Sequence, residues 1–153
     1  MFKKLLFIVI LAVLGYLFFV KQDATKQFIE PLVGPQVRIA GNVFYVDVAD
    51  DPDERLLGLS NRESLGKDRG MIFLFEKENL YGFWMKDMFF PIDIVWVKGD
   101  QVAGFSENLE PDDRFDRPLY YPPDPVDKVL EINAGEVQRR GMKIGDPVEI
   151  ILK

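Results

Sequence analysis

The chain has 153 residues, of which 48% are hydrophobic and 29% are charged, a composition typical of one globular domain and not of a disordered or repetitive protein. It contains no cysteine and no histidine, which excludes disulfides, thiolate nucleophiles, the common zinc sites and every catalytic arrangement built on histidine. Any catalysis must therefore use carboxylates, lysine, arginine, tyrosine, serine or backbone groups.

The charge is unevenly distributed along the chain. The formal net charge is −6, but residues 1–21 hold three lysines and no acidic residue. The remaining residues, 22–153, contain 16 basic and 25 acidic side chains and have a net charge of −9. Because this part would be repelled by a phosphate backbone, we expect no nucleic-acid partner.

The N-terminus is predicted to be a membrane segment. Lys3 and Lys4 precede an uncharged apolar run, residues 5–20, and no small-residue cleavage pattern follows it. We therefore expect residues 1–21 to form an uncleaved signal anchor. This single transmembrane helix would leave the N-terminus in the cytoplasm and the rest of the chain outside the cell membrane, in the periplasm. A cleaved and secreted form is the alternative.

The exported part is predicted to be a linker, residues 22–37, followed by one domain, residues 38–153. The linker contains two prolines and a glycine with little periodicity. In chain order, the domain is expected to contain strands at 43–48, 71–75, 92–97, 101–105, 128–132 and 148–152, short helices at 50–58 and 134–140, and a proline-rich loop at 108–125. Many short strands with one or two short helices predict a mostly β fold, a small β-barrel-like domain preceded by one N-terminal transmembrane helix.

An aromatic block, FWMKDMFFPIDIV at residues 83–95, is distinctive. Together with Gly70-Met71-Ile72-Phe73, Tyr121-Pro122 and Gly141 with Ile144-Gly145-Asp146, it resembles domain-of-unknown-function family 192 over nearly all of residues 43–151. The resemblance implies a small β-barrel-like domain, often exported, with no agreed activity. Three residues differ from the family's usual pattern: Asp87 replaces Asn, Ser60 replaces a large apolar residue, and Pro123 replaces a Ser, which excludes a serine nucleophile at that position.

Two acidic side chains are predicted to point toward apolar surroundings. Strand alternation places Asp93 on the same face as Val95 and Val97, and Glu131 on the face opposite to Leu130. A carboxylate there needs a cation, hydrogen-bond donors or a raised pKa, and Lys86 is the nearest cation in sequence. The three residues predict either a buried network that fixes strand register, a ligand or hard-cation site, or a general acid–base pair.

Aromatic side chains near this block have two interpretations. They either fill the core or form a stacking platform for a sugar ring or peptide; they are Phe83, Trp84, Phe89, Phe90 and Trp96. Tyr121, in the proline-rich loop, could similarly contact a partner or pack the loop over the barrel mouth.

The function predicted from these features is a non-catalytic accessory module that binds a cell-envelope ligand or a protein partner and contacts the membrane through its N-terminal helix. No cofactor and no metal is expected. The candidate ligand-binding residues are Trp84, Lys86, Asp87, Asp93, Tyr121 and Glu131. The alternative is an enzyme acting on a cell-envelope carbohydrate with Asp93 and Glu131 as its carboxylate pair. A purely structural role in assembly is a third hypothesis.

Overall fold

The computed structural model describes residues 34–152. The predicted anchor at 1–21 and most of the predicted linker lie outside the described residues. Within residues 34–152, no helix has the length and apolar character needed to cross a membrane.

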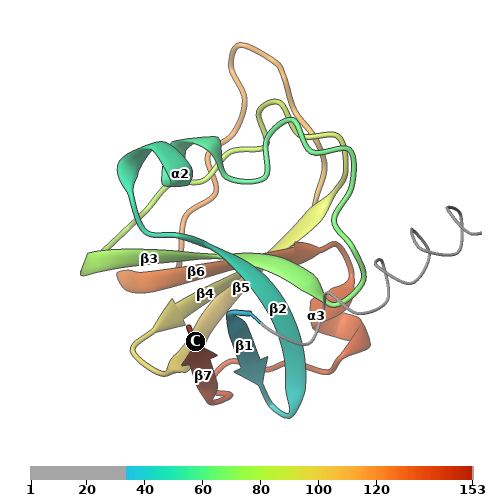
Figure 1. Ribbon diagram of the computed structural model, residues 1–153. Coiled ribbons are helices and arrows are strands. Elements are labelled where there is room, and N and C mark those ends of the chain that lie inside the picture. Colours follow the sequence, from blue (N-terminus) through green and yellow to red (C-terminus); the bar gives the residue numbers. More distant parts are fainter. Residues whose placement is uncertain (1–33, 153) are drawn as a thin grey trace, which may run out of the picture. The chain divides into compact units, whose positions relative to one another are not determined.

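Seven strands form one sheet that curls into a half-barrel (Figure 1). They are β1 (Gln36–Ile39), β2 (Asn42–Ala49), β3 (Arg69–Asn79), β4 (Ile92–Lys98), β5 (Gln101–Leu109), β6 (Val126–Asn133) and β7 (Val148–Ile151), in the spatial order β5-β4-β6-β3-β2-β1-β7. β2 and β3 are parallel, and every other neighbouring pair is antiparallel. The two edge strands meet at one end, where the Val102 N–H donates to the Asp146 carbonyl at 3.0 Å. The mostly β fold expected from the sequence is confirmed.

Two short helices interrupt the strands, at α2 (Pro52–Leu57) and α3 (Glu136–Arg139). The Asp51 side chain caps α2 by accepting the Glu54 N–H at 2.8 Å, which satisfies one of the free donors of the first turn. Gly58 ends the helix in a conformation with φ of 52°. The predicted helix at 50–58 is therefore confirmed, whereas the one at 134–140 is reduced to a single turn.

β1 was not predicted, and it begins at Gln36, inside the segment expected to be a linker. The strand has only four residues. It pairs on one side with β2, which follows it, and on the other with β7, at the far end of the chain. Its extended form thus depends on a partner about 110 residues away in sequence, which local pattern alone does not reveal.

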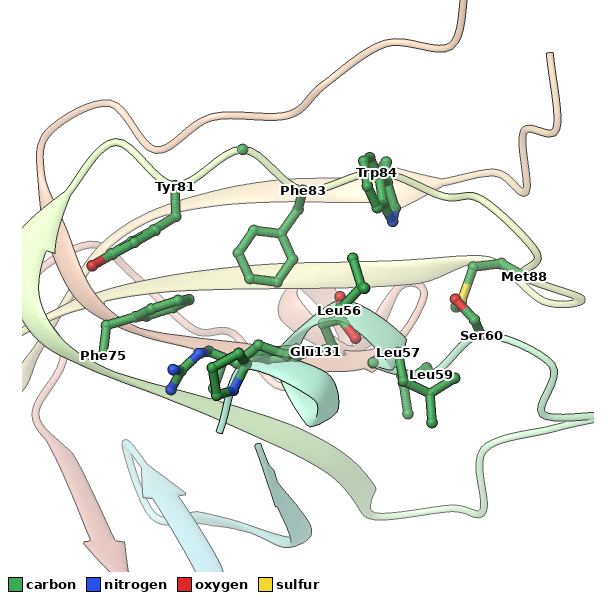
Figure 2. Close-up of a pocket in the computed structure, with 15 residues that line it drawn as sticks. Leu56, Leu57, Leu59, Ser60, Phe75, Tyr81, Phe83, Trp84, Met88 and Glu131 are labelled. Atoms are coloured by element: carbon green, nitrogen blue, oxygen red, sulfur yellow. The ribbon is translucent and has the colours of Figure 1, made fainter. Parts of the chain in front are cut away.

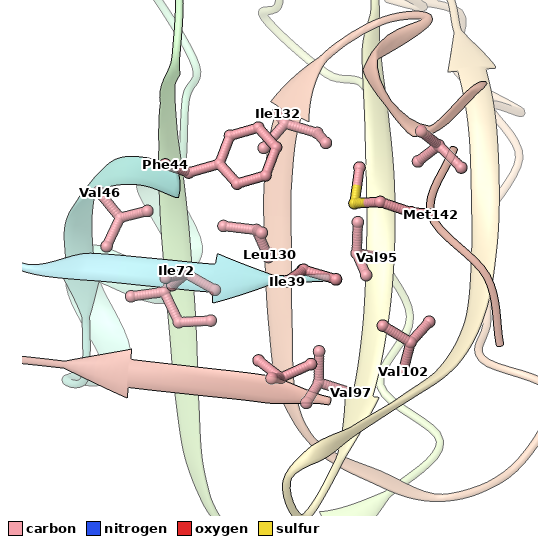
Figure 3. Packing of buried hydrophobic residues seen from close by; sticks show 13 residues of the cluster. Ile39, Phe44, Val46, Ile72, Val95, Val97, Val102, Leu130, Ile132 and Met142 are labelled. Atoms are coloured by element: carbon pink, nitrogen blue, oxygen red, sulfur yellow. The ribbon is translucent and has the colours of Figure 1, made fainter. Parts of the chain in front are cut away.

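Alternating side chains divide the interior into two cores on the two faces of the sheet. The first fills the inside of the curl and includes Phe44, Val95 and Ile132 (Figure 3). The second lies on the opposite face, where α2 and the loops preceding β4 and β6 pass over the strands (Figure 1), and includes Phe73 and Trp96. Because the central strand β6 contributes apolar residues to both cores, a polar side chain on it lies between apolar layers on either face.

Candidate functional site

A pocket of about 270 Å³ opens between α2 and the segment that follows β3, over the second core (Figure 2). Its floor is formed by Phe73 of β3 and Glu131 of β6. The turn after α2, which includes Gly58, forms one wall, and Tyr81 and Phe83 form the other. We refer to it as the Glu131 pocket.

Glu131 lies at the centre of the sheet, paired with Met71 of β3 and Ile94 of β4. Its side chain is buried, with 5% of the residue exposed, and Oε2 has no hydrogen-bond partner within the described part of the chain. Burial raises the pKa of this carboxyl to about 8, although the positive charge of Arg62 opposes the shift. At neutral pH the group is therefore largely protonated and can donate a hydrogen bond.

Gly58 allows the main chain to pass close to this floor. A Cβ at this position would lie 3.4 Å from Cζ of Phe73 and 3.9 Å from Oε2 of Glu131, and the backbone φ is positive. A residue with a side chain would be strained in this conformation. Glycine thus both ends α2 and brings the turn over the carboxyl group.

The second wall is aromatic and rigidly packed. The rings of Phe75 and Tyr81 stack with their centroids 3.6 Å apart, and Phe83 meets Phe73 and Trp96 edge to face at 5.0 and 5.6 Å. Such pairs fix ring orientations beyond what burial alone achieves. This wall is therefore preformed.

Arg55 of α2 is the second charged residue of the pocket lining. Its Nη1 donates to the carbonyls of Asp50, at 2.6 Å, and Leu74, at 2.8 Å, and its guanidinium lies 5.4 Å from the ring centroid of Phe75. In residues 34–152 its hydrogen bonds use Nη1 alone and it has no carboxylate partner. Its other guanidinium N–H groups have no hydrogen-bond partner within residues 34–152.

The rim of the pocket exposes large apolar side chains. Leu56 and Leu57 are 65% and 57% exposed, and Trp84 is 40% exposed, although all three line the pocket. Figure 2 shows the two leucines near Glu131 and Trp84 next to Phe83. An exposed apolar rim around a floor that carries a single buried acid is typical of a binding site.

The structure brings together two of the six predicted site residues in this pocket, Trp84 and Glu131. Lys86 and Asp87 lie outside it and form an exposed ion pair with Nζ and Oδ2 3.2 Å apart. They line a neighbouring groove of about 340 Å³ to which Trp84 also contributes. Tyr121 is half exposed and packs against Gly82, where a Cβ would come within 2.8 Å of the tyrosine ring.

Asp93 is not part of the pocket, and the expected cluster of Asp93, Glu131 and Lys86 is wrong. Asp93 pairs in register with Ile132 and shares the first core's face of the sheet, whereas Glu131 faces the second core. Asp93 is fully buried, with Oδ1 accepting the Asn108 N–H at 2.8 Å and Oδ2 accepting the Val137 N–H at 3.0 Å. Backbone donors, not Lys86, satisfy this carboxylate.

The aromatic block has a divided role. Trp96 is fully buried and Phe90 packs against the second core, whereas Phe83 packs against that core and also lines the Glu131 pocket. Trp84 and Phe89 are exposed, at 40% and 62%, and only Trp84 of these two lines the Glu131 pocket.

Sequence reasoning missed the contribution of α2 to the site. The sequence predicts only an ordinary short helix at Arg55, Leu56 and Leu57, although two adjacent leucines on a six-residue helix indicate an unburied apolar surface. Among residues 34–152, no group of three or more acidic side chains is arranged to hold a metal ion.

The fold and the pocket together define a small, mostly β domain with a curled sheet and an apolar site around one buried acid. The chain belongs to the DUF192 family, described as an uncharacterized ACR, whose sequence profile matches residues 35–150.

Comparison with solved structures finds similar proteins. A protein of unknown function from Novosphingobium aromaticivorans DSM 12444 is 32% identical, with a TM-score of 0.71, over 78% of this chain and 94% of that one. A protein described as a candidate transcription regulator from Sinorhizobium meliloti 1021 is 31% identical, with a TM-score of 0.70, over 77% of this chain and 94% of that one. No curated protein matches the chain.

Proposed function

We propose that this domain is a non-catalytic binding module and that its ligand occupies the Glu131 pocket. The observation that carries the proposal is the buried carboxyl of Glu131, whose Oε2 has no partner in residues 34–152 although it borders an open pocket. An unpartnered buried polar group is costly unless something satisfies it. A bound ligand supplies the missing hydrogen bond, and the exposed Leu56, Leu57 and Trp84 supply apolar contact.

A catalytic role on carbohydrates has no support in this arrangement. Glycosidic chemistry needs two carboxyl groups flanking one cleft, and Asp93 lies on the other face of the sheet with both oxygens bound to backbone N–H groups. Glu131 is the only acidic residue that lines the described pocket. One protonated acid in an apolar pocket is better suited to holding a ligand than to general acid–base turnover.

We further propose that residues 1–21 anchor this module in the cell membrane with the domain outside, in the periplasm. The uncharged run at 5–20 after Lys3 and Lys4 supports the proposal. Fractionation and protease accessibility of the full chain in spheroplasts test it: the domain should be membrane-bound and degraded by external protease. Protection from the protease would overturn the orientation, and the mass of the mature N-terminus reveals whether a cleaved form exists.

The description of the Sinorhizobium relative as a candidate regulator of transcription does not lead us to propose nucleic-acid binding here. Residues 22–153 carry a net charge of −9, and phosphate contacts would be repelled. A cell-envelope ligand or protein partner is the proposed occupant.

Ligand-observed NMR with the isolated domain tests the binding function. Residues 34–153 form one compact unit with its own two cores, so they can be studied without the anchor. A library of small apolar compounds with one polar group is screened against three proteins: the unmodified domain, Ser60→Leu and Ser64→Leu. Ser60 lines the pocket, so a leucine there narrows it, whereas Ser64 is an exposed residue outside it.

We expect compounds that bind the unmodified domain to bind Ser64→Leu equally and to lose at least about tenfold in affinity for Ser60→Leu, a free-energy change of roughly 1.4 kcal/mol. If no compound binds, or if the Ser60→Leu variant binds as well as the others, the pocket is not a binding site.

A further inference from the structure

We propose that the ligand of the Glu131 pocket carries a hydrogen-bond acceptor oxygen, in a carbonyl or carboxylate group, on a small apolar body. This inference rests on the proposed binding function and names the chemical class of the ligand. The inference depends on which polar side chains line the pocket and on which of these already have hydrogen-bond partners.

Two polar side chains of the lining have their hydroxyl donors occupied. The Ser60 hydroxyl donates to the Lys86 carbonyl at 3.0 Å, and the Tyr81 hydroxyl donates to the Lys77 carbonyl at 2.7 Å. The charged lining residues are Glu131 and Arg55, and neither has a side-chain ion-pair partner within residues 34–152. A ligand in the pocket therefore meets Glu131 at the floor and has Arg55 as the other charged residue of the lining.

Both groups present donors to the pocket. Arg55 has only donors, and its Nη1 alone is engaged, with main-chain carbonyls. Glu131 is protonated at neutral pH because burial disfavours its charged form, so its carboxyl also donates. A ligand with an acceptor oxygen accepts from the Glu131 carboxyl at the floor, and Arg55 is a second donor residue in the lining.

The charges around Glu131 disfavour a cationic ligand. The positive charge of Arg62 acts on Glu131, although Arg62 lies outside the pocket lining and is paired with Asp47 at 2.6 Å; Arg55 lines the same pocket. The strand neighbours of Glu131, which are Met71 and Ile94, carry no charge. An ammonium group would thus enter a pocket whose charged lining residues are a guanidinium, that of Arg55, and a neutral acid.

The size of the pocket fits one ring with one polar substituent. A dry apolar cavity of about 150 Å³ is sufficient for benzene, and this pocket measures about 270 Å³. The apolar body would contact Leu56, Phe83 and Trp84, and the acceptor oxygen would point toward Glu131.

Three probes of matched ring size test the proposal: acetophenone, a neutral acceptor; benzoate, an anionic acceptor; and benzyltrimethylammonium, a fixed cation. Binding to the domain, residues 34–153, is followed by NMR of ¹³C-labelled methionine methyl groups between pH 6 and 9. The Met88 methyl reports on the pocket that it lines, and Met142, in the first core, is the internal control.

We expect acetophenone or benzoate to shift the Met88 resonance with an affinity that falls about tenfold between pH 7 and pH 9, as the carboxyl loses its proton. Stronger binding of benzoate would indicate that the pocket prefers carboxylate ligands, and stronger binding of acetophenone would indicate that it prefers neutral carbonyl ligands. Preferential binding of benzyltrimethylammonium, with an affinity that increases with pH, would overturn the proposal while leaving the binding function intact.

Two variants separate hydrogen bonding from shape. Glu131→Gln keeps a donor, so binding should persist within about threefold and lose its pH dependence. Glu131→Leu keeps the approximate volume without a donor, so affinity should fall at least about tenfold. An unchanged affinity in Glu131→Leu would contradict the acceptor-oxygen model, whereas the absence of binding by any probe or screened compound would contradict the binding function itself.

Discussion

Asp93 and Glu131 are carried by adjacent strands, yet their carboxyl groups point to opposite faces of the sheet. β4 and β6 pair with Asp93 opposite Ile132 and Ile94 opposite Glu131. Residues directly opposite each other in a sheet share a face, and consecutive residues alternate. The two carboxyl groups thus lie on opposite sides of the sheet. Substitutions of Asp93 and of Glu131 are therefore expected to affect stability and ligand binding differently.

Asp93→Asn should destabilise the domain. The carboxylate accepts the Asn108 N–H with one oxygen and the Val137 N–H with the other, in a fully buried position. An amide offers only one acceptor oxygen, so one of these two N–H groups loses its partner and about 1–3 kcal/mol is lost.

Urea unfolding of residues 34–153 measures this effect, with Asp124→Asn as the matched control, since Asp124 is exposed. If the free energies of unfolding of the two variants differ by less than about half a kcal/mol, the effect of Asp93→Asn is within the range of ordinary surface substitutions. That result would show that Asp93 does not hold α3 and β5 in place.

Glu131→Gln should change how stability depends on pH. The pKa of Glu131 is raised to about 8 in the folded domain from an ordinary 4.5, so between these values the folded state holds a proton that the unfolded state has lost. The free energy of unfolding contributed by this group therefore falls as pH rises through this window, by about 1 kcal/mol per pH unit, and levels off above pH 8.

The glutamine variant lacks this slope, so its stability relative to the unmodified domain should increase from pH 5 to pH 8. Urea unfolding at four pH values measures the difference, with Glu63→Gln, an exposed position, as the control. If the free energy of unfolding depends on pH in the same way for the unmodified domain and for Glu131→Gln, the Glu131 carboxyl is ionised in the folded domain.

Gly70→Ala should destabilise the contact between β3 and β6. A Cβ at Gly70 would lie 2.7 Å from the main-chain carbonyl oxygen of Glu131 and 3.2 Å from side-chain atoms of Leu130 and Ile132. Because the nearest atom belongs to a paired strand, the backbone must shift, at a cost of about 1–3 kcal/mol.

Gly66→Ala is the comparison, because its Cβ would meet only the flexible side chain of Arg69 at 3.2 Å. Thermal unfolding of both variants should show a clearly lower midpoint for Gly70→Ala alone. Equal midpoints would mean that the sheet adapts without strain.

Asp51→Ala should weaken the pocket through α2. Loss of the cap on the Glu54 N–H costs about 1 kcal/mol, and the end of this short helix carries Leu56 and Leu57 at the rim. Probe binding, followed at the Met88 methyl group, should weaken in this variant. The control is Asp53→Ala, in the first turn of the same helix, because the Asp53 side chain does not cap the helix. This control should change neither probe affinity nor the free energy of unfolding by a comparable amount. Unchanged binding in Asp51→Ala would show that α2 does not position the rim.

Local patterns in the sequence determined most of the strands. Alternation correctly placed Asp93 with Val95 and Val97, and Glu131 opposite to Leu130, because successive side chains of a strand must point to opposite faces. The cap and proline at the start of α2 likewise determined that helix. The family followed from the aromatic block and the motifs around it.

Only the tertiary structure decided which residues form the site. Register between β4 and β6 separated Asp93 from Glu131, β1 became a strand through its distant partner β7, and the turn at Gly58 brought α2 over a carboxyl 73 positions later in the chain. Strand pairing and chain reversal depend on contacts between residues far apart in sequence, so no local pattern encodes them. For this reason the sequence predicts only that Glu131 is a polar residue on an apolar strand. The fold alone shows that this residue borders an open pocket and that its Oε2 has no hydrogen-bond partner within residues 34–152.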